Sequence, residues 1–140
     1  MKYIRSKKAS YFSIIALMFS VFWIERSEKD LIGKSTDLIG IAPETLKQNH
    51  VILVFMPSCS HCQKAAQKLQ KQYNKTKNIT GLTSTEFDKD IKRFRDSLNI
   101  TFPIVTIEKP QLRKYFKKIP KYVLVQNGVV GAIADSLQLN

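Results

Sequence analysis

Hydrophobic positions divide this chain into one long apolar segment and a series of shorter periodic ones. The long segment is residues 9–24, which contain no charged side chain. Further along, residues 51–56 (VILVFM) are six consecutive apolar residues, a run typical of a strand buried on both faces at the centre of an α/β sheet. Pro57 ends this run, and from Cys59 to Tyr73 apolar side chains recur every three or four positions, which predicts a helix. A buried strand is thus expected to lead directly into a helix.

The remainder of the chain alternates between strand and helix patterns and ends in a hairpin. Apolar residues from Phe87 to Leu98 follow a spacing of four, three and four, which predicts a helix capped by Ser84 or Thr85. Asn127-Gly128 between two apolar runs is the strongest short hairpin signal. The other expected elements are a short helix at 43–47, strands at 78–82, 102–107, 122–125 and 129–133, and a helical turn at 111–116. This order predicts an α/β fold with a central mixed β-sheet flanked by helices.

The amino-terminal apolar segment predicts a membrane anchor. Positive charges precede it, and Ile24-Glu25-Arg26 after it offers no small-residue cleavage site, so we expect a retained signal-anchor. The positive-inside rule then leaves the amino terminus in the cytoplasm and carries the rest of the chain across the membrane. We expect residues 1–25 to form an uncleaved transmembrane helix, residues 26–40 a linker, and residues 41–140 the folded domain.

Charge and composition narrow the classes of partner. With 44% hydrophobic and 24% charged residues, the chain has the composition of an ordinary globular protein. The net charge of +12 is large, but many of the basic residues lie ahead of the apolar segment or along the polar face of the helix after Cys59. We therefore expect no nucleic-acid partner, and an acidic protein or lipid headgroups as the natural complement of the charge.

The only two cysteines, Cys59 and Cys62, are separated by two residues. Cys59 falls at the expected amino terminus of a helix, where unpaired N–H groups and the helix dipole favour a thiolate and hence a nucleophile. Cys62, one turn further, is placed to attack a mixed disulfide on Cys59. A Cys-x-x-Cys pair also serves as half of a metal site, so redox chemistry and metal binding both remain open.

Two stretches carry a resemblance to the thioredoxin superfamily. Residues 51–69 (VILVFMPSCSHCQKAAQKL) resemble its active-site strand, motif and helix, and residues 119–128 (IPKYVLVQNG) resemble its cis-proline loop, next strand and hairpin. The resemblance covers about residues 41–133. Within the superfamily the chain is similar to membrane-tethered bacterial proteins of the TlpA/ResA kind, and more loosely to the thioredoxin-like module of DoxX-type proteins of Bacteroidetes.

This resemblance implies a thioredoxin-like fold and a thiol-disulfide oxidoreductase that acts on protein thiols and disulfides. Cys59 would be the attacking thiol, Cys62 the resolving thiol and Pro120 the cis-proline that faces them, with no cofactor and no metal. The implied location is the bacterial inner membrane, as a single-pass protein whose domain faces the periplasm or extracytoplasmic side. A membrane redox partner is a further candidate.

Two positions near the cysteines modify this expectation. His61 between them resembles the oxidising DsbA-type motif, and an imidazole there stabilises a thiolate, which should raise the reduction potential above the roughly −270 mV of thioredoxin. Six residues before Cys59, where thioredoxins have a buried aspartate that is thought to move protons, this chain has Leu53. Proton transfer must then use water, His61 or another group.

Three other interpretations compete with the redox enzyme. A peroxiredoxin needs a threonine three residues before its reactive cysteine, and Met56 stands there. A zinc or copper site of a metallochaperone would recruit Cys59 and Cys62 with His61 or His50, the only other thiolate or imidazole ligands in the chain. A non-catalytic interaction module would leave the cysteine pair without a role.

Overall fold

The computed structural model describes residues 28–137. The expected anchor at residues 1–25 lies outside this range, as do residues 138–140. Among the described residues, no helix has both the length and the apolar character needed to cross a membrane.

A five-stranded mixed sheet forms the centre of the fold. Its strands are β1 Asn49–Val54, β2 Ile79–Ser84, β3 Ile104–Ile107, β4 Lys121–Gln126 and β5 Val129–Ala134. They lie in the order β3-β2-β1-β4-β5, in which β1, β2 and β3 are parallel and β4 and β5 are antiparallel to their neighbours. The expected mixed sheet with its central strand is therefore confirmed.

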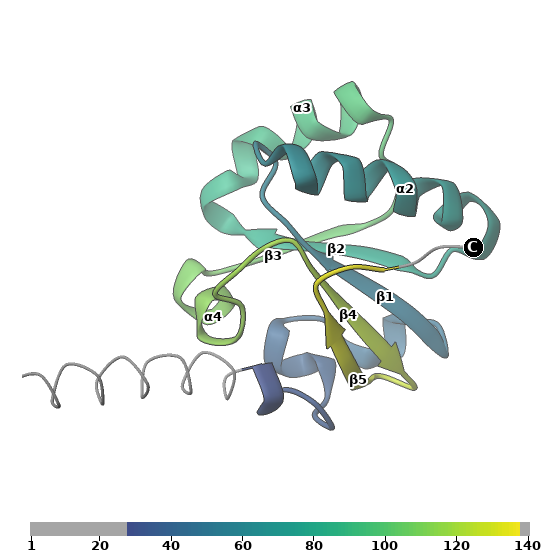
Figure 1. Ribbon diagram of the computed structural model, residues 1–140, viewed down its shortest axis with the longest axis vertical. Helices are drawn as coiled ribbons and strands as arrows, with labels where there is room; N and C mark the ends of the chain where they lie inside the picture. The colour runs from purple at the N-terminus through teal and green to yellow at the C-terminus, as the bar shows by residue number, and fades with distance from the viewer. Residues whose placement is uncertain (1–27, 138–140) are drawn as a thin grey trace, which may run out of the picture.

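Helices cover both faces of this sheet (Figure 1). The helices α2 (Ser60–Thr76) and α3 (Asp88–Leu98) lie on one face, and α4 (Lys109–Tyr115) lies on the other together with the amino-terminal described segment. Because successive side chains of a strand point to opposite faces, β1 contributes to two separate cores. Leu53 joins the core under α2 and α3, whereas Ile52 and Val54 join the core under α4. All three side chains are fully buried.

The hairpin that joins β4 to β5 has the predicted turn. Asn127 and Gly128 both adopt positive φ, 51° and 77°, as a tight turn between right-twisted strands requires. A Cβ atom at Gly128 would lie 2.4 Å from the Cβ of Pro43, so only glycine fits there. Pro43 itself begins a three-residue 3-10 helix, Pro43–Thr45, in place of the expected short helix at 43–47.

The segment expected as a linker, residues 26–40, belongs in large part to the folded domain. Leu31 and Ile39 are fully buried in the core beneath α4. The N–H of Gly33 donates to the carbonyl of Val130 at 2.7 Å, and the N–H of Thr36 donates to the carbonyl of Gly128 at 3.1 Å. The domain therefore starts well before residue 41, because this segment packs along β5, far away in the sequence.

Candidate functional site

Cys59 caps the amino terminus of α2. Its backbone is extended, and its Sγ accepts a hydrogen bond from the N–H of Cys62 at 3.3 Å. Its carbonyl accepts from the N–H of Gln63 at 3.0 Å, the first hydrogen bond of the helix. A sulfur in this position faces unpaired N–H groups and the positive end of the helix dipole, both of which stabilise a thiolate.

The loop between β1 and α2 is held by short-range hydrogen bonds. The side-chain amide of Gln63 donates to the carbonyl of Pro57 at 2.9 Å, and the N–H of Cys59 donates to the carbonyl of Met56 at 3.2 Å. The N–H of Phe55, the first residue after β1, donates to the carbonyl of Leu82 in β2 at 3.1 Å. These bonds fix Cys59 relative to the sheet, so the reactive position is built into the strand-to-helix junction.

Cys62 is the buried partner of this pair. Its side chain is fully buried in the core that contains Leu53, whereas Cys59 is half-buried and reaches solvent. Burial, followed by a hydrogen bond to Cys59, raises the pKa of the Cys62 thiol to about 12. Both cysteines are free thiols. One sulfur is thus accessible at the first turn of the helix, and the other is sheltered and held as a thiol.

A pocket of about 260 Å³ lies beside the cysteine motif, between α2, the start of β4 and the segment after β5. His61 is exposed on its wall, and Pro120 lies on the same wall, preceded by a cis Ile119–Pro120 peptide bond as the resemblance implied. The lining residues are His61, Lys64, Ala65, Lys68, Leu69, Pro120, Tyr122, Asp135, Ser136 and Leu137. The structure therefore brings the motif and the cis-proline loop, about sixty residues apart in the sequence, to one surface.

Tyr122 is a residue of this site that the sequence analysis did not single out. It lies in β4 directly opposite Leu53 of β1, and it packs against the same core as Cys62. Burial raises the pKa of Tyr122, and the negative charge that Cys62 carries once it is ionised raises it further. The available signal was a hydroxyl-bearing side chain two residues after Pro120, at the start of the apolar run 123–125.

Lys121, next to Pro120, is a buried cation with two acidic partners. Its Nζ lies 3.1 Å from Glu28 and also pairs with Asp135. Burial alone would lower the pKa of Lys121, but the hydrogen bonds that its Nζ donates to Asp135 and Glu28 outweigh burial and raise the pKa. These ion pairs tie both ends of the described chain to the loop that holds Pro120.

His50, the second histidine, is not brought to the cysteines. It lies near the start of β1, at the opposite end of the strand from Cys59. Its Nδ1 accepts from the N–H of Lys47 at 3.1 Å, and its Nε2 is hydrogen-bonded to the hydroxyl of Thr80 at 2.8 Å. Burial, and then the positive charge of Lys47, lower the pKa of His50 to about 4. Within residues 28–137, no three His, Cys, Asp or Glu side chains gather as a metal site would require.

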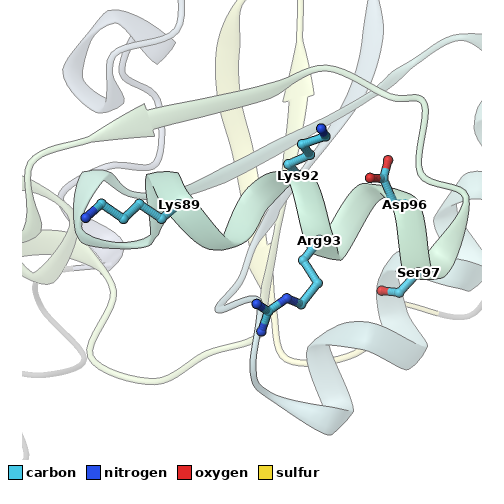
Figure 2. Close-up of a pocket in the computed structure, with 5 residues that line it drawn as sticks. All are labelled: Lys89, Lys92, Arg93, Asp96 and Ser97. Atoms are coloured by element: carbon cyan, nitrogen blue, oxygen red, sulfur yellow. The ribbon is translucent and has the colours of Figure 1, made fainter.

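A second hollow, of about 530 Å³, lies on the outer face of α3 (Figure 2). It is lined by Lys89, Lys92, Arg93, Asp96 and Ser97. Figure 2 shows these side chains projecting in different directions from a single helix. They form a solvated basic face and do not converge on a common point.

Among the comparisons with known proteins, only the comparison with solved structures identifies similar proteins. The sequence matches no protein-family model, and no curated protein sequence matches it significantly. Solved structures do match. The chain is similar to a secreted disulfide oxidoreductase of Mycobacterium tuberculosis that is homologous to DsbE of E. coli, with 13% identity, a TM-score of 0.56, and coverage of 67% of this chain and 74% of that one.

Two further structures show the same likeness. The thioredoxin domain of a thiol-disulfide oxidoreductase from Bacteroides vulgatus is 22% identical, with a TM-score of 0.55 over 70% of this chain and 72% of that one. StoA from Bacillus subtilis is 19% identical, with a TM-score of 0.54 over 64% of this chain and 75% of that one. At these identities the likeness establishes the fold: residues 28–137 have a thioredoxin-like α/β fold.

Proposed function

We propose that this chain is a thiol-disulfide oxidoreductase in which Cys59 attacks and Cys62 resolves. The observation that carries the proposal is the asymmetry of the two sulfurs. Cys59 caps α2, reaches solvent and accepts the N–H of Cys62, whereas Cys62 is fully buried beneath the same helix turn. The fold shared with structures of thiol-disulfide oxidoreductases supports the same reaction class.

The exchange balances with the two cysteines alone. The Cys59 thiolate attacks one sulfur of a substrate disulfide, the substrate S–S bond breaks, and the departing sulfur leaves as a thiolate that takes up a proton. Cys62 then loses its proton and attacks the Cys59 sulfur, which releases the second substrate thiolate. The substrate gains two electrons and two protons, and Cys59 and Cys62 become a disulfide. The reverse sequence oxidises a dithiol substrate.

We propose further that the substrates are extracytoplasmic proteins and that residues 1–25 tether the domain to the bacterial inner membrane. The pocket beside the motif offers an open wall at Pro120 on which an extended segment of a protein substrate can lie. A function of the TlpA/ResA kind, with a membrane redox partner, is consistent with the charge order around the apolar segment.

Trapping of the mixed disulfide tests the redox assignment. The full chain with Cys62→Ser, purified in detergent and mixed with insulin, should accumulate a covalent complex that dithiothreitol releases. The matched variant Cys59→Ser should form none. Complexes formed through Cys62 in the Cys59→Ser protein would reverse the roles of the two residues.

The tether is tested by topology. Alkaline phosphatase fused after Asn140 should be active in a bacterial host and should stay with the membrane fraction, whereas the same fusion lacking residues 1–25 should be inactive. Release of a shortened, active, soluble fusion would show cleavage instead of an anchor, and an inactive full-length fusion would reverse the orientation.

A further inference from the structure

The resolving step requires a group that the expected position does not supply. Cys62 must become a thiolate before it attacks, and in the protein with both thiols free, burial and then a hydrogen bond to Cys59 raise its pKa to about 12. Leu53 occupies the place where the resemblance implies a proton-handling aspartate, and this leucine is fully buried and apolar. Leu53 therefore offers no polar group to stabilise the negative charge that develops on Cys62.

The strand register places such a group next to Leu53. Tyr122 of β4 is directly opposite Leu53 of β1 in the antiparallel pair. Directly opposed residues extend their side chains from the same face of a sheet, with Cβ atoms roughly 4.5–5.5 Å apart. Leu53 and Cys62 belong to the core on that face, and Tyr122 packs against it. The phenol thus stands on the side of the sheet that carries the buried sulfur.

Tyr122 also connects this core to solvent. It is half-buried and lines the 260 Å³ pocket together with His61 and Pro120. Its electrostatic coupling to Cys62 has the sign that a hydrogen-bond donor needs, because burial and then the charge of Cys62 raise the pKa of Tyr122 and keep its hydroxyl protonated. The other acidic group on the pocket wall, Asp135, is already paired with Lys121.

We propose that the Tyr122 hydroxyl donates a hydrogen bond to the Cys62 sulfur as it ionises, and so accelerates release of the reduced substrate. In this step the Cys62 proton passes to water or a buffer base that enters through the pocket. The thiolate then attacks the Cys59 sulfur, the bond between Cys59 and the substrate breaks, and its electron pair leaves on the substrate sulfur. The inference rests on the proposed function, because it assigns a residue to that function's second step.

The test separates the two steps. Reduced full-length protein in detergent is mixed with one equivalent of 5,5′-dithiobis(2-nitrobenzoate), and release of the coloured thiolate is followed in time. The first equivalent reports attack by Cys59 and the second reports resolution by Cys62. Loss of a hydrogen bond to a charged group should make Tyr122→Phe about tenfold slower in the second release, and should shift the pH profile of that release upward by about one unit. The first release should be unchanged.

Tyr73→Phe is the matched control, because it removes the same hydroxyl from the other end of α2 and should behave as wild type. Wild type, Tyr122→Phe and Tyr73→Phe share the same ionisable groups on the pocket wall, so these groups do not affect the comparison. They are His61, Lys64, Lys68 and Asp135. A second release within about twofold of wild type, or equal slowing of both releases, would overturn the role of Tyr122. Wild-type release that persists in Cys59→Ser would overturn the proposed function instead.

Discussion

The cysteines and histidines of the chain lie in two environments, one at the amino end of strand β1 and the other at the junction between the carboxyl end of β1 and helix α2. At the amino end, His50 is buried, and both of its ring nitrogens are engaged, by the N–H of Lys47 and the hydroxyl of Thr80. At the carboxyl end, Cys59 is half-exposed and caps α2, beside a pocket that His61 lines. Residue type alone does not distinguish these two ends.

The two environments differ in whether the fold leaves the reactive atoms free to contact another molecule. The hydrogen bonds of His50 are complete within the domain, so it contributes to stability and offers nothing to a ligand. The sulfur of Cys59 receives one N–H donor but keeps a face toward solvent, so it remains available to a second sulfur. A reactive type of side chain becomes a functional candidate where the fold activates it without covering it.

The largest expected effect is that substitution of Cys59, beyond the carboxyl end of β1, abolishes turnover, whereas substitution of His50, near its amino end, does not. Cys59→Ser should reduce the catalysed reduction of insulin by dithiothreitol to the uncatalysed rate, because serine cannot form the mixed disulfide. His50→Gln should keep turnover per folded molecule within about twofold of wild type. The two variants are assayed side by side in the full chain. Equal losses in both would remove the distinction between the two ends of β1.

The sulfurs of Cys59 and Cys62, which follow the carboxyl end of β1, should differ strongly in their rate of alkylation. At pH 7, iodoacetamide should modify Cys62 in Cys59→Ser at least about a hundredfold more slowly than Cys59 in Cys62→Ser, because only the thiolate reacts and burial raises the pKa of Cys62 to about 12. Mass spectrometry against time measures both rates. Similar rates would mean that Cys62 is neither sheltered nor held as a thiol.

His50, near the amino end of β1, should affect how the stability of the domain depends on pH. The pKa of His50 is lowered to about 4 in the folded protein, from 6.5. The folded state therefore binds fewer protons than the unfolded state between these values. The contribution of His50 to the free energy of unfolding is fully present above about pH 6.5. It is lost as pH falls from there through 4, and the total loss is at most about 3 kcal/mol.

Urea unfolding of wild type and His50→Gln at pH 7 and at pH 4.5 isolates this contribution, since the carboxylates titrate in both proteins. Wild type should lose more stability than the variant on acidification. An identical loss in both proteins would show that His50 is not held neutral by the fold.

The smallest effect concerns His61. Its exposed position beside Cys59 predicts that the imidazole stabilises the reduced, thiolate form. His61→Ala should therefore lower the reduction potential of the cysteine pair by about 30 mV, and Lys71→Ala, further along α2, should not change it. Equilibration of each protein with glutathione measures the potentials. Equal potentials in wild type and His61→Ala would leave His61 without a tuning role.

Local sequence signals predicted the carboxyl end of β1 well. A continuous apolar run, Pro57 and the three-and-four spacing after Cys59 are all contained in one short stretch, and the structure places the strand, the loop and α2 there. Asn127-Gly128 likewise determines its hairpin through its own backbone conformation. Each of these features depends on neighbours in the sequence.

Features that depend on distant contacts were not predictable in the same way. Leu31 and Ile39 are core residues because their segment packs along β5, and no periodicity in their own stretch marks that packing. Tyr122 joins the site because β4 pairs with β1 in one particular register. A shift of one residue would turn its side chain to the other face of the sheet. Register across strands is a tertiary property, so the sequence pattern identified the motif but not that Tyr122 packs against the core that contains Cys62.

A redox titration of the full chain tests the central claim most directly. The protein is equilibrated with mixtures of reduced and oxidised glutathione, and the free thiols are counted by alkylation and mass. The two thiols should disappear together in a single two-electron transition with a midpoint above about −270 mV, and Cys62→Ser should show no such transition. Two thiols that remain free under the most oxidising mixture would contradict the assignment of Cys59 and Cys62 as a redox pair.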